Sequence, residues 1–168
     1  MDLQTERLFI TDLREDMAEA IHRNSMDQDT RRFVPDEVFE TIEEAREAVT
    51  FLLKAGYSRE GPLVCPILLK KDGSNIGYVQ LCRIAEGWEI GYHVAMAHTG
   101  KGYATEALRA FVPYIMKQRK LSELYGISLA ENRASCCVLE KCGFALFFRG
   151  ESLYQGKRQM VCKYRYQL

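Results

Sequence analysis

The 168-residue sequence lacks any long apolar run, and it lacks an excess of charge of either sign. No stretch reaches the roughly 20 apolar residues that span a bilayer, so we expect no membrane partner. The start, Met1 to Gln4, leads into no apolar segment of the kind found in signal peptides, so we expect a cytoplasmic protein. Lys plus Arg and Asp plus Glu both number 23. This balance gives no global basic field, so we expect no nucleic-acid partner.

The chain also lacks the patterns of common metal and nucleophile sites. Its six cysteines form no Cys-x-x-Cys pair, which argues against zinc and thioredoxin-like sites, and most are expected to be small core residues. Its three histidines form no His-Glu-x-x-His, so we expect no metal. Gly126 to Ala130 nearly matches a hydrolase elbow, but no histidine follows Ser128 to complete a triad in that order.

What is present indicates one folded domain. Hydrophobic residues make up 47% of a chain of single-domain length, which favours a globule with its own core. Hydrophobic spacing and turn residues predict helices over 16–24, 39–53 (opened by a Thr41–Glu44 capping box), 103–117 and 132–142, with Pro113 kinking or shortening the third. Strands are expected over 6–13, 64–70, 76–84, 88–94, 124–129, 144–149 and 158–166. Several antiparallel hairpins in a mixed α/β order argue against a doubly wound sheet.

The most informative stretch is Gly100-Lys101-Gly102-Tyr103-Ala104-Thr105, which lies between a predicted strand and a predicted helix. Two glycines permit a tight turn and a close approach of backbone to a ligand. The first amides of a helix have no partners within it, so such a turn can bind a phosphate or diphosphate. The spacing fits neither a P-loop nor the dinucleotide fingerprint. These residues alone leave two interpretations open: an anion site, or a helix entry that only turns tightly.

A second stretch, Asn132 to Phe144, reads Asn-Arg-Ala-Ser-Cys-Cys-Val-Leu-Glu-Lys-Cys-Gly-Phe. Together the two stretches resemble the GNAT superfamily of N-acetyltransferases, and most closely its ribosomal-protein N-terminal (RimJ/RimL-like) branch. Thr5 to Leu8 and Glu89 to Tyr92 resemble that branch as well, in the same order. The resemblance implies a single α/β (α+β) GNAT domain over 1–168: a bent, mostly antiparallel mixed sheet, flanked by helices and splayed between its central strands. It also implies acetyl transfer from acetyl-CoA to a primary amine by direct attack, with no metal.

The resemblance also assigns site residues. The backbone of Tyr92, His93 and Val94 is expected to bind the pantetheine arm and thioester, and the backbone amides from Thr99 to Thr105 the pyrophosphate. Thr99 replaces the family's long polar residue, and Lys101 can substitute in part. Asn132 is either a pantetheine ligand or a helix N-cap, and Glu89 is the expected general base, with His93 as its rival. Leu139 stands where many GNAT enzymes place a tyrosine acid for the leaving thiolate. Ser135, facing the cofactor sulfur or a CoA oxygen, or a water is then the remaining candidate acid.

The amine acceptor cannot be identified from the sequence. The resemblance places substrate-binding loops at about Asp27 to Phe39 and near the last hairpin. The alternatives are a protein N-terminal amine, a small amine such as a polyamine or antibiotic, or a catalytically weak acyl-CoA-binding protein. The chain is expected to be a monomer or homodimer. Aromatic residues that either line a substrate site or pack in the core are Phe33, Phe39, Tyr57, Trp88 and Tyr154.

Overall fold

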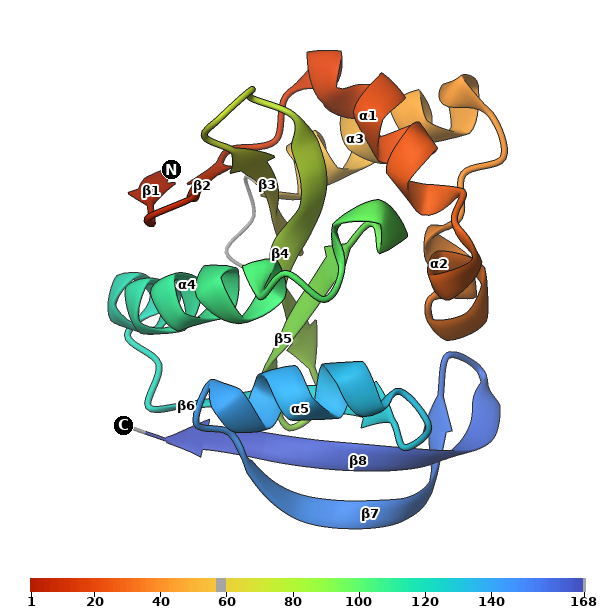
Figure 1. Cartoon of the computed structure of the whole chain (residues 1–168). Helices are drawn as coiled ribbons and strands as arrows, with labels where there is room; N and C mark the ends of the chain where they lie inside the picture. Colours follow the sequence, from red (N-terminus) through yellow and green to blue (C-terminus); the bar gives the residue numbers. More distant parts are fainter. Residues whose placement is uncertain (57–59, 168) are drawn as a thin grey trace.

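The computed structural model describes residues 1–56 and 60–167. Within these residues, helices pack around one sheet of strands (Figure 1). The strands are β1 (Asp2–Gln4), β2 (Leu8–Thr11), β3 (Leu63–Leu69), β4 (Asn75–Ile84), β5 (Gly87–Val94), β6 (Glu123–Leu129), β7 (Ala145–Tyr154) and β8 (Lys157–Gln167). The helices are η1 (Glu15–Met17), α1 (Ala18–Ser25), α2 (Gln28–Phe33), η2 (Pro35–Glu37), α3 (Ile42–Gly56), η3 (Met96–His98), α4 (Tyr103–Arg119) and α5 (Arg133–Lys141).

The strands form one sheet in the order β1-β2-β3-β4-β5-β6-β8-β7. All neighbours are antiparallel except β5 and β6, which are parallel. β4 and β5 pair along the whole of β5, whereas β5 and β6 are in register at one position, Glu89 opposite Tyr125. The sheet is therefore mixed, mostly antiparallel and split between two central strands, as predicted.

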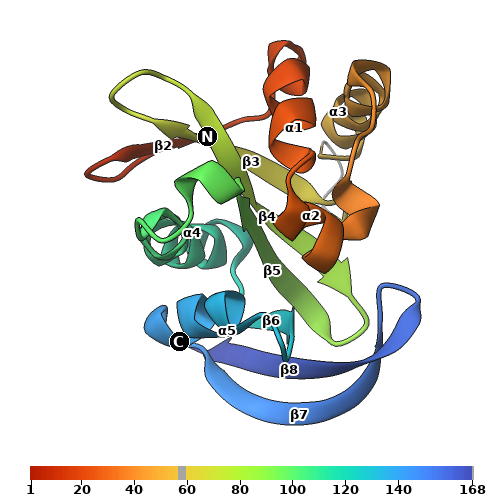
Figure 2. The same cartoon turned by 45° about the vertical axis from the view of Figure 1, so that its right-hand side comes forward.

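The two faces of the sheet carry different helices: α4 and α5 lie on one side, and α1, α2 and α3 on the other (Figure 2). The alternation of side chains along β5 serves both faces. Ile90 and Tyr92 pack with the main core beneath α4, which includes Leu108 and Phe111. Residues of the opposite face, such as His93, border a cavity beneath α1 and α3. β5 thus carries alternate side chains to two separate surfaces.

Three local predictions are corrected by the structure. The first strand is shorter, from Leu8 to Thr11, and the segment from Asp27 to Phe39 is largely helical rather than a loop. Pro113 does not shorten its helix, since α4 continues to Arg119. Pro113 is exposed, while Phe111 and Ile115 are buried against the sheet. Packing of this buried face stabilises the helix beyond the proline, which local propensity alone does not predict.

The Thr41–Glu44 capping box is confirmed. The backbone N–H of Glu44 donates to Thr41 Oγ1 over 3.2 Å, and the Glu44 carboxylate accepts from the backbone N–H of Thr41 over 3.4 Å and of Glu40 over 2.7 Å. α3 therefore begins at Ile42, three residues later than expected. Its buried face, with Ala45 and Val49, packs toward α1 and β3.

Candidate active site

The glycine loop leads from β5 through η3 into α4. Gly100 has φ = +72° and Gly102 has φ = +81°, a left-handed conformation that disfavours side chains with a Cβ. Gly102 is the N-cap of α4, so the first amides of this helix emerge directly from the loop. This geometry suits an anionic group at the helix start.

The loop is fixed to the first strand region by a charged cluster. Arg7 pairs with Glu106 in the first turn of α4, with Nε–Oε2 and Nη2–Oε2 distances of 2.6 Å. Arg7 Nη1 also donates to the carbonyl of Lys101 over 3.0 Å, and Thr5 Oγ1 donates to Glu106 Oε1 over 2.6 Å. Burial acts to raise the pKa of Glu106, but these hydrogen bonds and the Arg7 charge outweigh it and lower the pKa. The Thr-Glu-Arg-Leu stretch therefore holds the loop in place.

α5 supplies the second group of polar atoms. Asn132 is its N-cap, and its side-chain oxygen accepts from the backbone N–H of Ser135 over 3.0 Å. The Tyr92 hydroxyl donates to the Ser135 carbonyl over 2.8 Å and lies 2.8 Å from Ser135 Oγ. Burial raises the pKa of Tyr92, so its phenol stays protonated at neutral pH. The cap role of Asn132 is thus confirmed, and Ser135 is held at the split in the sheet.

A cavity of about 180 Å³ lies at this split. Its lining includes Glu89, Tyr92, Asn132 and Ser135, so four of the predicted site residues come together there. The other lining residues are Phe33, Val34, Glu37, Tyr78, Gln80, Cys82, Ile90, Gly91, Ile127, Ser128, Leu129, Tyr154 and Gln155. We call this the smaller cavity.

Glu89 lies where β5 and β6 diverge. Its side chain is half-buried, and its carboxylate accepts a hydrogen bond from the backbone N–H of Ile127 across the split. Burial raises the pKa of Glu89 to about 7, and the negative charge of Glu86 adds to this effect. The Ile127 hydrogen bond and the positive charge of Lys163 act in the opposite direction. A carboxylate with a pKa near neutrality is suited to accept a proton at physiological pH.

A second carboxylate, Glu37, borders the same cavity and was not predicted as a site residue. Burial raises its pKa to about 7, with the Asp36 charge adding to the shift. Gln80 Nε2 donates to Glu37 Oε1 over 3.4 Å, which is long for a hydrogen bond. The only sequence signal was its position within 27–39, the segment expected to bind substrate.

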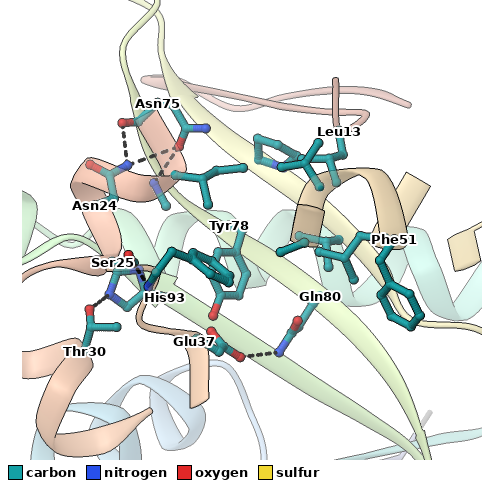
Figure 3. Close-up of a pocket in the computed structure, with 18 of the residues that line it drawn as sticks. Leu13, Asn24, Ser25, Thr30, Glu37, Phe51, Asn75, Tyr78, Gln80 and His93 are labelled. Atoms are coloured by element: carbon teal, nitrogen blue, oxygen red, sulfur yellow. Dashed lines mark hydrogen bonds between the residues drawn. The ribbon is translucent and has the colours of Figure 1, made fainter. Parts of the chain in front are cut away.

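A larger cavity of about 270 Å³ adjoins the smaller one beneath α1 and α3. Glu37, Tyr78 and Gln80 belong to the walls of both. Figure 3 shows Tyr78 and His93 together on its wall, where their rings stack with centroids 5.7 Å apart. His93 Nε2 lies 2.7 Å from Thr30 Oγ1, and burial lowers the pKa of His93. His93 therefore borders the larger cavity and is absent from the lining of the cavity that holds Glu89.

Other predicted positions lie outside both cavities. The loop residues Thr99 to Thr105 line neither cavity, and neither does Val94, which packs against the core. Lys101 Nζ donates to the Ala97 carbonyl over 2.9 Å, and Thr99 Oγ1 donates to the Met96 carbonyl over 2.9 Å. In this state both side chains stabilise η3 and the loop.

The comparison with protein families settles the class. Residues 7–145 match the model described as an acetyltransferase (GNAT) domain. The chain belongs to the GNAT acetyltransferase family. It is similar to the uncharacterized N-acetyltransferase YnaD of Bacillus subtilis, with 27% identity over 145 residues that cover 85% of this chain and 82% of YnaD.

Solved GNAT structures share the fold over nearly the whole chain. A GNAT-family acetyltransferase from Bacillus anthracis matches with a TM-score of 0.85 and 26% identity, covering 99% of this chain and 98% of that one. The ribosomal L7/L12 alpha-N-protein acetyltransferase RimL, in complex with coenzyme A, matches with a TM-score of 0.86 and 17% identity, covering 100% and 98%. At that identity the second match shows the fold alone. The findings support N-acetyltransferase activity and leave the RimJ/RimL branch unconfirmed.

The position at which many GNAT enzymes carry a tyrosine acid is occupied here by a buried leucine. Leu139 packs against Gly126 of β6, where a Cβ would lie 2.7 Å from Leu139 Cδ2. A different tyrosine, Tyr154 from the β7–β8 hairpin, lines the smaller cavity instead. Burial raises the pKa of Tyr154, and the charges of Glu89 and Glu37 raise it further. The smaller cavity therefore contains a neutral phenol that comes from β7 and not from α5.

The predicted aromatic lining is only partly correct. Phe33 and Tyr154 line the smaller cavity and Phe39 lines the larger one. Trp88 lines neither cavity, because it packs against the core with Arg83 and Arg119 over its ring. Tyr57 lies outside the described residues. Gln155 Nε2 donates to the Phe33 carbonyl over 3.0 Å, so the last hairpin touches the helical segment 27–39.

Among the described residues, no helix is both long and apolar enough to cross a membrane.

Proposed function

We propose that this GNAT protein transfers the acetyl group of acetyl-CoA to a primary amine by direct attack in a ternary complex. The observation that carries the proposal is the convergence of Glu89, Asn132 and Ser135 on one cavity at the split between β5 and β6. Only in a folded chain do a proton acceptor, a helix cap and a hydroxyl from two separate segments meet there.

The loop suits the diphosphate of acetyl-CoA. Its two left-handed glycines bring backbone close to a ligand, and the α4 start offers unpaired amides to phosphate oxygens. In the proposal, the amides from Thr99 to Thr105 bind the pyrophosphate, while the backbone of Tyr92 to Val94 and the side chain of Asn132 bind the pantetheine arm. The co-substrate supplies an activated acetyl thioester.

In the proposed reaction, residues of this chain accept and donate the protons while the acetyl group moves from sulfur to nitrogen. The amine nitrogen bonds to the acetyl carbon, the carbon–sulfur bond breaks, and the amine proton passes to Glu89, directly or through water. The sulfur takes a proton from water, either directly or through Ser135 Oγ, which lies against the protonated Tyr92 hydroxyl and regains from water the proton it gives. A base with a pKa near 7 is mostly ionised at pH 7.5, and its conjugate acid is closer in strength to an ammonium than an ordinary glutamic acid is.

The acceptor in this proposal is a primary amine, either a protein N-terminal amine or a small amine. Near pH 7.5 roughly a third of peptide α-amines are neutral, against about one lysine amine in a thousand. A site whose proposed base, Glu89, has a pKa of only about 7 suits the amine that needs less deprotonation.

An acceptor screen tests the proposal. Purified protein is mixed with acetyl-CoA and with N-terminal peptides, alkylamines, polyamines and aminoglycosides, and CoA release is measured beside mass detection of the acetylated product. We expect an acetylated amine and one equivalent of CoA. Tight acetyl-CoA binding with no product from any amine would instead support an acyl-CoA-binding protein without turnover.

A further inference from the structure

Much of the wall of the larger cavity, beneath α1 and α3, is apolar. Its apolar lining includes Ile21 of α1, Val49 and Phe51 of α3 and Pro66 of β3, together with Leu13 and Phe39 from connecting segments. Val49 is fully buried, whereas Phe51 is 66% exposed at the edge of the cavity. An apolar cavity of about 150 Å³ can hold a benzene molecule. A cavity of about 270 Å³ therefore has room for a ring or a short alkyl chain.

The charged groups of this cavity are gathered toward the smaller cavity. Glu37 stands in the wall that the two cavities share, and Glu89 lies in the smaller cavity beyond it. Figure 3 shows Glu37 and Gln80 on one side of Tyr78, with Leu13 and Asn75 on the other. Asn24 and Asn75 there are neutral amides: Asn24 Nδ2 donates to the Asn75 carbonyl over 2.9 Å. Asp36 also borders the cavity but is exposed to water.

We propose that the acceptor is a primary amine joined to a compact apolar body, with its nitrogen between Glu37 and Glu89 and its body in the larger cavity. This inference rests on the proposed acetyl transfer and names the class of its acceptor. A cationic amine entering the site meets two carboxylates, Glu37 and Glu89, in the lining of the smaller cavity. The apolar body then leaves water for a wall of aliphatic and aromatic side chains, which is favourable in proportion to the area buried.

The same geometry disfavours polyamines. A second ammonium on the acceptor would enter the apolar region, where the described side chains offer neutral amides and no buried carboxylate beyond Glu37. Burying an unpaired cation is strongly unfavourable. The pocket thus selects by what lies behind the reacting nitrogen.

Hexylamine and 1,5-diaminopentane form a matched pair for the test. Both have seven heavy atoms, but one ends in a methyl group and the other in a second ammonium. We expect kcat/KM for hexylamine to exceed that for the diamine by at least tenfold, although the diamine offers two reactive nitrogens. Peptides beginning with Phe and with Ser, beside 2-phenylethylamine, distinguish a free amine from an N-terminal residue as the source of the apolar body.

A cavity-filling substitution tests whether the preference for hexylamine depends on the larger cavity. Ala48 of α3 lines the larger cavity, and Thr50 of the same helix is exposed and lines neither cavity. Ala48→Phe is expected to abolish at least nine-tenths of the preference for hexylamine, while Thr50→Phe leaves it intact. If Ala48→Phe lowers the melting temperature, Ala48→Leu replaces it as the cavity-filling variant. Acetyl-CoA affinity, measured by calorimetry, should not change in any of the three variants.

The outcomes separate the two proposals. Equal turnover of hexylamine and the diamine, or an undiminished preference in folded Ala48→Phe, would overturn the apolar-body inference while acetyl transfer stands. If no amine is acetylated, calorimetric titration of hexylamine into the CoA-bound protein decides the inference alone. Binding that Ala48→Phe removes supports the pocket, and absence of binding contradicts it.

Discussion

On the side of the sheet that carries α4 and α5, the candidate binding groups are backbone amides and a helix cap from two short stretches of sequence. On the side that carries α1, α2 and α3, the groups are side chains from η2, β4, β5 and the β7–β8 hairpin. The first surface is built by local conformation: two left-handed glycines and an asparagine cap. The second exists only after segments far apart in the chain have packed together. The difference predicts that changes on the two sides will have separable effects.

The largest effect is expected where the two sides meet, at Glu89. Glu89→Gln should lower turnover by a factor of about 10² to 10⁴, the usual range for a lost general base. In the wild-type protein kcat/KM should rise with pH through an apparent pKa near 7, because the carboxylate must be ionised to accept the proton. The rise of kcat/KM through this pKa should be absent in Glu89→Gln. Higher pH should restore part of the variant's rate by deprotonating the amine. The pH–rate profiles of both proteins measure this.

Retention of near-full turnover by Glu89→Gln at neutral pH would remove Glu89 from the mechanism. His93→Gln is the informative second variant, because His93 is the rival base. His93 lies in the larger cavity and is bonded to Thr30, so its loss should affect acceptor binding rather than the proton step. If both variants keep full turnover, water accepts the proton.

Glu37, on the side of the sheet that carries α1, α2 and α3, is expected to lower the stability of the folded protein at neutral and higher pH. Its folded-state pKa of about 7 lies above the usual value near 4.5. The folded protein then holds this proton more tightly than the unfolded chain does, so stability falls as pH rises from about 4.5 to about 7. Glu37→Gln removes this penalty and should raise the free energy of unfolding at pH 8 by up to about 3 kcal/mol. At pH 4 the two proteins should be alike.

Denaturant unfolding at both pH values measures the Glu37 effect, with Glu47→Gln as control. Glu47 is an exposed residue of α3 outside both cavities. A gain in stability at pH 8 for Glu37→Gln, with a loss of amine affinity, would mark a residue placed for function rather than for folding. Equal behaviour of Glu37→Gln and Glu47→Gln would contradict the buried position of the carboxylate.

The contrast between the two sides also explains what the sequence could predict. The glycine loop and the Asn132 cap each lie within a few residues, and their conformations follow from residue types with strong local preferences. The split sheet was expected from the family resemblance. Glu37 was missed, because its meeting with Gln80 joins residues 43 positions apart. The hydrogen bond from Thr5 to Glu106 spans 101 positions, so the role of the first strand region could not be predicted either.

On the cofactor side, Gly102→Val should weaken acetyl-CoA binding by more than tenfold, or about 1.4 kcal/mol. Valine resists φ = +81°, so the loop would lose its shape, although its Cβ would make only an ordinary contact, 3.5 Å from Arg7 Nη2. Gly73 has φ = +72° in the β3–β4 turn, and a Cβ added there would meet no atom within 4 Å, which makes Gly73→Val the matched control. Both variants should lose stability, but only Gly102→Val should lose affinity by calorimetry. Unchanged affinity in folded Gly102→Val would exclude the loop.

The smallest effect separates cap from ligand at Asn132. Asn132→Ala removes the acceptor of the Ser135 N–H and should cost about 1 kcal/mol of folding stability. Thr41→Ala removes the corresponding bond to the Glu44 N–H at the start of α3, on the other side of the sheet. If Asn132 also binds the pantetheine arm, the two variants should lose similar stability while only Asn132→Ala loses acetyl-CoA affinity. Equal affinities would make Asn132 a cap alone, and the cofactor side would then depend on backbone amides without this side chain.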